Sequence, residues 1–74
     1  MTFEEVAQST ARMLKRAAGD RTRLELAELA NVSPMCMRDY LTGRSIPRLD
    51  KLGKILEACG YELTISIRKV DDDE

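Results

Sequence analysis

Residues 22–43, TRLELAELANVSPMCMRDYLTG, predict two short helices joined by a very tight turn. The first helix begins at Thr22, because Thr22 and Glu25 form the S/T-x-x-E pattern of a capping box. It ends near Asn31, since asparagine is one of the few non-glycine residues that tolerate the left-handed conformation used to leave a helix. The apolar residues between these ends can share one stripe: Leu26, Ala27, Leu29 and Ala30.

The second helix of the pair begins almost at once. Ser33 is a preferred N-cap residue, and Pro34 takes the first helical position, where its missing N–H leaves no hydrogen bond unmade. Gly43 stands just past the expected end of this helix. The turn between the two helices is therefore confined to residues 31–33.

An amphipathic helix is predicted on each side of this pair. Thr2 and Glu5 form another capping box at the start of the first segment, and Gly19 is its natural stop. The last segment begins at Leu49 and is stopped by Gly60. The side chains expected to face the core are Phe3, Val6, Ala7, Thr10, Met13, Leu14 and Ala17 in the first segment, Met37 in the third, and Leu49, Leu52, Ile55, Leu56 and Cys59 in the fourth.

Residues 61–69, YELTISIRK, alternate apolar and polar side chains with the period of two that is typical of a half-buried strand. No second run of this kind exists in the sequence. A lone strand leaves unpaired backbone donors and acceptors along its edges and is not stable in water. Two-fold pairing with the same strand of a second chain would satisfy them. The alternatives are that the strand folds back on its own helices or remains a frayed end.

The length of 74 residues allows one small domain, of a size that buries only about 60% of its unfolded surface. Residues 1–60 are expected to form the helical domain and residues 61–69 the strand. Residues 70–74 are expected to form an acidic disordered tail.

Positive charge is concentrated in the centre of the chain. The formal net charge is -1, but residues 1–70 carry 12 basic against 9 acidic residues, a net charge of +3. Between Arg12 and Lys54 there are 10 basic and 5 acidic residues. This distribution is compatible with a polyanionic partner.

Several classes of site and of location are disfavoured by the composition. Cys36 and Cys59 lie 23 positions apart, the sequence has no histidine, and no CxxC spacing occurs, so no metal and no cofactor are expected. No segment is apolar enough to span a membrane, and the N-terminus does not have the pattern of a signal peptide. The protein is therefore expected to be cytoplasmic, with reduced thiols.

The run LAELANVSPMCMRDYLTGRSIPRLDKL, residues 26–52, resembles the Cro and phage-repressor type of helix-turn-helix protein, often called the Xre family. The resemblance extends over residues 10–60, and the continuation into ILEACGYELTISIRK is similar to the antitoxin-like branch of that family. It rests on residue types and spacings that agree together. The residues that carry it are Leu26, Ala27, Val32, Ser33, Met37, Tyr40, Gly43, Pro47 and Leu52.

The resemblance implies a mainly all-α, lambda-repressor-like domain of four to five helices, with one C-terminal β-strand that pairs across a dimer. It also implies double-stranded DNA as the partner, with base contacts from the exposed start of the third helix. An arginine there can bind guanine O6 and N7, an aspartate can accept from cytosine N4, and a methionine can contact a thymine methyl. An ion pair between Arg38 and Asp39 is the alternative role for that arginine. The residues expected to contact bases are Pro34, Met35, Arg38 and Asp39.

Two further sets of residues follow from the same resemblance. Helix N-termini and basic side chains around the third helix are expected to bind the DNA phosphates. These residues are Thr22, Arg23, Ser33, Thr42, Arg44 and Arg48. The dimer contact is expected to use Tyr61, Leu63, Ile65 and Ile67.

The function expected from this reasoning is a homodimeric transcriptional repressor that binds an inverted repeat. The alternatives are an antitoxin that neutralises a protein toxin and regulates its own operon, and a phage-encoded regulator of a neighbouring small gene. An exposed Leu24 and the acidic tail are the features that favour a protein partner. An enzyme is not expected, because no residue constellation supplies acid-base or covalent chemistry.

Overall fold

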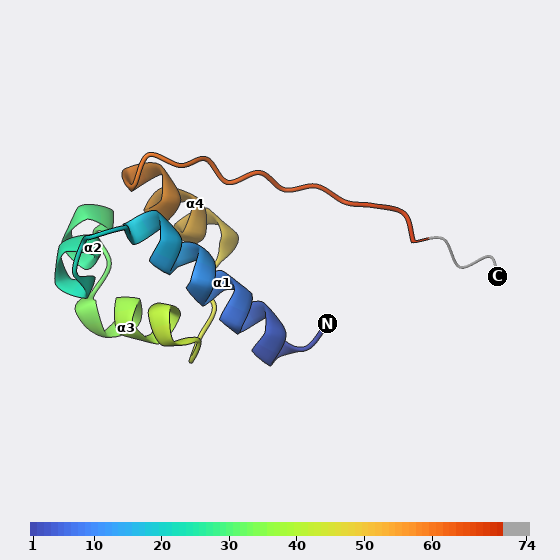
Figure 1. The fold of residues 1–74 in the computed structure, drawn as a ribbon, viewed down its shortest axis with the longest axis horizontal. Helices are drawn as coiled ribbons and strands as arrows, with labels where there is room; N and C mark the ends of the chain where they lie inside the picture. Colours follow the sequence, from blue (N-terminus) through green and yellow to red (C-terminus); the bar gives the residue numbers. More distant parts are fainter. Residues whose placement is uncertain (71–74) are drawn as a thin grey trace.

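The computed structural model describes residues 1–70 of the chain, which form four α-helices and a C-terminal extended segment (Figure 1). The predicted mainly helical fold is confirmed, with four helices and no strand in the part of the chain that the structure describes. The predicted acidic tail lies outside the described residues, apart from Val70. The helices are α1 Phe3–Ala18, α2 Arg23–Ala30, α3 Pro34–Thr42 and α4 Leu49–Ala58.

The two predicted capping boxes are both formed. The Oγ1 atom of Thr2 accepts a hydrogen bond from the Glu5 amide at 3.1 Å, and the Thr2 amide donates to Glu5 Oε1 at 2.7 Å. Thr22 and Glu25 make the same two bonds at 3.1 and 2.8 Å. Each box satisfies backbone donors that the first turn of a helix leaves without partners, which explains why α1 and α2 begin where the sequence predicts.

The turn between α2 and α3 is built from local backbone chemistry. Asn31 takes the left-handed conformation at φ 58°, and the Val32 amide donates to the Ala27 carbonyl at 2.9 Å. Ser33 then caps α3 by accepting from the Cys36 amide at 3.2 Å. One helix thus ends and the next begins within three residues, and these caps fix the end of α2 and the start of α3.

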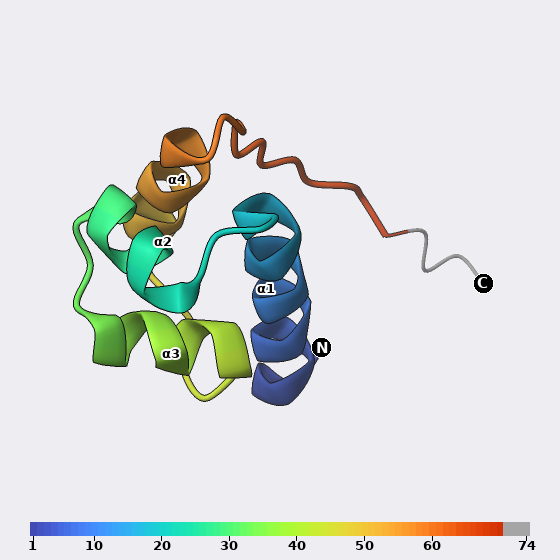
Figure 2. The same ribbon diagram turned by 60° about the vertical axis from the view of Figure 1, so that its left-hand side comes forward.

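The four helices pack together (Figure 2), and each of them contributes side chains to one core. The largest fully buried side chains are one from each helix: Leu14, Leu26, Met37 and Ile55. Burial of such a side chain stabilises the fold by about 1.5–3 kcal/mol. The helices therefore depend on one another, and α3 is held in place by packing against α1 and α2.

The sequence pattern misplaces some apolar side chains. The residues expected in the core that are instead exposed are Phe3, Met13, Leu29 and Leu49. The buried stripe of α1 runs through small residues, and Ala11 and Ala18 are part of it. Because alanine is common on every face of a helix, it does not mark the buried face in the sequence. The larger Met13 and Phe3 therefore dominate the apolar pattern from which the core was predicted.

The C-terminal segment leaves the helical body as an extended chain, which Figure 1 shows running away from α4. Gly60 has φ 86°, and the Tyr61 amide donates to the Leu56 carbonyl at 2.8 Å, so the chain turns sharply after α4. Leu63 is half-buried against the core, whereas Ile67 is 97% exposed. Residues 61–70 pair with no strand among residues 1–70, and the strand shared between two chains stays a prediction.

Candidate nucleic-acid interface

One face of α3 is buried and the opposite face is open to solvent. Met37 is fully buried, and Tyr40 and Leu41 are half-buried against the core. None of the four side chains predicted to contact bases is buried. Of these, Pro34, Met35 and Arg38 are exposed and Asp39 is half-buried.

Arg38 and Asp39 form an ion pair. The Arg38 Nε atom lies 3.7 Å from Asp39 Oδ1, a distance too long for a good hydrogen bond but within range of charge attraction. The two side chains are 45% and 33% exposed, so solvent screens the attraction. The ion pair that the sequence offered as an alternative role for Arg38 is thus present, and it is weak enough to rearrange.

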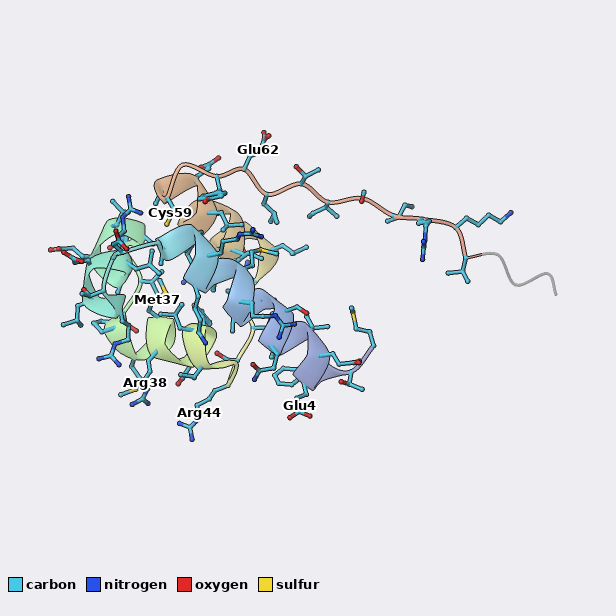
Figure 3. The ribbon with its side chains drawn as sticks, viewed as in Figure 1. Glu4, Met37, Arg38, Arg44, Cys59 and Glu62 are labelled. Carbon is cyan, nitrogen blue, oxygen red and sulfur yellow. The ribbon has the colours of Figure 1, made fainter. Side chains whose placement is uncertain are left out.

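Arg38 and Arg44 point out of the molecule on the same side, away from the buried Met37 (Figure 3). Arg44 follows the end of α3, where Gly43 takes the left-handed conformation at φ 80°. The Arg44 amide donates to the Asp39 carbonyl at 2.9 Å, which completes the C-terminal cap of the helix. The cap therefore sets the position of the Arg44 backbone relative to α3.

The basic residues expected at phosphates differ in their surroundings. Arg48 forms an ion pair with Asp50 at 3.3 Å, and both side chains are largely exposed. Exposed pairs of this kind contribute about 0–1 kcal/mol, so Arg48 can exchange Asp50 for another anion at little cost. Arg23 and Arg44 are exposed and take part in no ion pair within the described residues.

The three hydroxyl groups expected at phosphates are already used in local hydrogen bonds. Thr22 and Ser33 act as N-cap acceptors, and each hydroxyl keeps its own proton for a further acceptor. The Thr42 hydroxyl donates to the Arg38 carbonyl at 2.8 Å, so it must rotate before it can donate to a phosphate. The Glu25 carboxylate lies at the start of α2 and opposes the binding of an anion there.

Gln8 is a residue of this region that the sequence analysis did not identify. Its side-chain amide lies over Gly43, with Nε2 only 2.5 Å from where a Cβ atom on Gly43 would be. An exposed glutamine on a helix carries no sequence signal of such a contact, because the two residues are distant in the chain. The side chain of Gln8 therefore fills the space beside Gly43, the residue before Arg44.

Tyr40 lies at the inner edge of α3, half-buried. Burial raises the pKa of Tyr40 above its ordinary value of 10.0, and the nearby Cys36 and Asp39 raise it further. The phenol is therefore neutral at physiological pH and acts there as a packing residue that contacts the core.

Residues 13–65 match the sequence profile of a family described as helix-turn-helix, and this range covers more than two-thirds of the chain. The chain belongs to the helix-turn-helix family. The match includes α2, the turn at residues 31–33 and α3, which are the two helices and the turn of the motif. The Xre-like character expected from residues 26–52 is thereby confirmed for the helix-turn-helix domain. A comparison with curated proteins and a comparison with solved structures each gave no significant match.

Membership of the helix-turn-helix family indicates a DNA-binding regulator, and the family is typically non-enzymatic. It says nothing of the antitoxin-like branch. Among residues 1–70, no group of three or more His, Cys, Asp or Glu side chains is placed to hold a metal ion. No helix in the same range is long and apolar enough to cross a membrane, since even α1 has only 16 residues.

Proposed function

We propose that the protein is a sequence-specific transcriptional repressor that binds an inverted-repeat operator as a homodimer in the cytoplasm. The observation that supports this most directly is the exposed face of α3 in a helix-turn-helix domain, where Met35 and Arg38 are both accessible. In such domains the second helix of the motif enters the major groove and contacts base edges.

The chemistry of that face suits a guanine and a thymine. The two terminal nitrogens of Arg38 can donate together to guanine O6 and N7. Met35 is 67% exposed and offers an apolar contact for a thymine methyl group. The proposed phosphate contacts come from Arg23, Arg44 and Arg48, which are all exposed.

The C-terminal segment is the proposed dimer contact. Tyr61 and Leu63 begin an extended segment whose next two apolar side chains, Ile65 and Ile67, are 65% and 97% exposed. Pairing of two copies would satisfy the free backbone groups and cover these apolar side chains at the same time. A two-fold protein implies two half-sites about one helical turn, or roughly 34 Å, apart.

Repression by this protein would work through occupancy of the operator. A small domain bound in the major groove excludes RNA polymerase from the same stretch of DNA, and this requires no effector. The proposed operator lies near the gene of the protein itself, so that the protein represses its own synthesis.

The experiment that tests the proposal is selection from a randomised duplex library at near-physiological salt, followed by determination of the mass of the complex. Recovery of an inverted repeat bound by two chains is expected. Recovery of no preferred sequence would show that α3 does not recognise bases. Truncation after Gly60 should leave monomers, and a truncated chain that still dimerises would remove the proposed role of residues 61–69.

A second candidate function is an antitoxin that holds a protein toxin inactive and regulates its own operon. The observation that favours it is the exposure of two leucines on α2, Leu24 at 58% and Leu29 at 47%. Large exposed apolar side chains are suited to contact another protein. This role would be established by a toxin encoded next to the gene of this protein. That toxin should bind the wild-type chain but not the Leu24→Ser variant.

A further inference from the structure

We propose that Asp39 determines the base specificity of α3 by acting through Arg38, as a positioning residue, rather than by contacting a base itself. This inference rests on the proposed function, because it assigns how the recognition helix chooses its base pair. It is carried by the ion pair between the two side chains and by the way their backbone is held.

The atoms that meet in the ion pair decide which part of the arginine stays available. The contact is made by Arg38 Nε, at 3.7 Å from Asp39 Oδ1. Guanidinium groups donate through five N–H bonds in a rigid plane, so a carboxylate that lies nearest to Nε leaves the outer N–H bonds of the two terminal nitrogens free. Those two donors form the bidentate pair that matches guanine O6 and N7. Asp39 therefore favours an end-on approach of Arg38 to a guanine.

Several hydrogen bonds at the end of α3 hold the backbone that carries the pair. The Arg38 carbonyl accepts from the Thr42 hydroxyl at 2.8 Å. The Asp39 carbonyl accepts from the amides of Arg44 and Ser45 at 2.9 and 3.3 Å. Arg38 thus extends from a backbone that is held at the end of α3. The weak attraction of the carboxylate biases its rotamers before DNA binds, which lowers the entropy cost of binding.

The negative charge of Asp39 also acts against incorrect binding. Arg38 without a neighbouring carboxylate could bind any DNA phosphate, which carries no sequence information. A carboxylate beside the guanidinium repels phosphates and leaves the approach to a base edge favourable. Asp39 therefore lowers affinity for arbitrary DNA more than it lowers affinity for the operator.

The experiment measures binding of Asp39→Asn and of the wild-type chain to two duplexes. The first is the duplex selected from the randomised library. The second differs from it only at the base pair for which Arg38→Ala has lost its preference. The asparagine keeps the size of the side chain and removes its charge. We expect Asp39→Asn to bind both duplexes more tightly and to lower the ratio of their affinities about three- to tenfold. Thermal unfolding verifies that each variant is folded.

Asp50→Asn is the matched control, since Asp50 also pairs with an exposed arginine, Arg48, at 3.3 Å. It should tighten binding to both duplexes without changing their ratio. The double variant Arg38→Ala/Asp39→Asn should show the same ratio as Arg38→Ala alone, because Asp39 acts through Arg38.

Three outcomes would overturn the inference. An unchanged ratio for Asp39→Asn would mean that the ion pair does not affect specificity. Loss of discrimination by Asp39→Asn at a base pair that Arg38→Ala still discriminates would mean that Asp39 contacts a base directly. An equal fall of the ratio for Asp50→Asn would mean a general effect of charge. If the wild-type chain selects no sequence, the proposed function itself fails, and this inference fails with it.

Discussion

The side-chain amide of Gln8 in α1 lies directly over Gly43, the residue that ends α3. Gln8 Nε2 is 2.5 Å from the position that a Cβ atom on Gly43 would occupy. Gly43 also has φ 80°, a conformation that residues with a Cβ atom rarely adopt. The end of α3 is therefore constrained by its own backbone, and the exposed side chain of Gln8 occupies the space beside it.

Substitution Gly43→Ala should destabilise the protein by about 1–2 kcal/mol through backbone strain, with an added cost for moving Gln8. Gly60→Ala is the matched control, because Gly60 has φ 86° and no neighbouring atom lies within 4 Å of the position that its Cβ atom would take. Urea unfolding of both variants gives the free energies of unfolding. Equal decreases for the two variants would show that the proximity of Gln8 contributes nothing.

Met37→Ala should lower the free energy of unfolding by about 2–5 kcal/mol, since Met37 is fully buried among side chains from the other helices. A domain of this size has a total stability of about 4–11 kcal/mol, so much of the chain could be unfolded. Met37→Leu preserves the volume and should cost less than about 1.5 kcal/mol. Similar decreases for both variants would contradict a tightly packed site.

Arg38→Ala should weaken operator binding by about 1–3 kcal/mol and relax the preference at one base pair. The reason is that the substitution removes two guanidinium donors that bind favourably only where they meet a guanine. Binding to a set of duplexes that differ at single positions provides the measurement. Uniform weakening on every duplex would instead assign Arg38 to a phosphate.

Arg44→Ala should weaken binding to all duplexes alike, because Arg44 is placed beyond the end of α3 and carries no ion pair in the described region. The slope of log K against log salt should become shallower by about 0.9 for each phosphate that the variant no longer neutralises. Affinities at several salt concentrations give this slope. A change of base preference with an unchanged slope would contradict a role at a phosphate.

The raised pKa of Tyr40 predicts a loss of stability in alkaline solution. Below the ordinary tyrosine pKa of 10.0 the phenol is neutral in both the folded and the unfolded chain, and it has no effect on the pH dependence. Above that value the unfolded chain releases the proton while the folded chain retains it, so unfolding becomes more favourable as the pH rises toward the raised pKa. Free energies of unfolding from about pH 8 to about pH 11 should therefore fall less steeply for Tyr40→Phe than for the wild-type chain. Identical slopes would mean that Tyr40 ionises equally easily in both states.

The sequence alone determined the helices, their ends and the turn between α2 and α3. These features depend on contacts within a few residues, as in the Thr22–Glu25 capping box and the left-handed Asn31, so local residue types are sufficient to predict them. The family resemblance likewise rested on local spacing, and the match over residues 13–65 confirmed it. The exposed face of α3 was expected from the same resemblance, in which Met37 takes an inward position.

Only the tertiary structure decided which side chains meet across the fold. The buried stripe of α1 passes through alanines and leaves Met13 exposed, and Gln8 lies over Gly43; both depend on how α1 packs against the other helices. Local propensities act over one or two turns of a helix. The buried stripe of α1 and the position of Gln8 arise instead from the close packing of whole helices, which the sequence pattern could not predict.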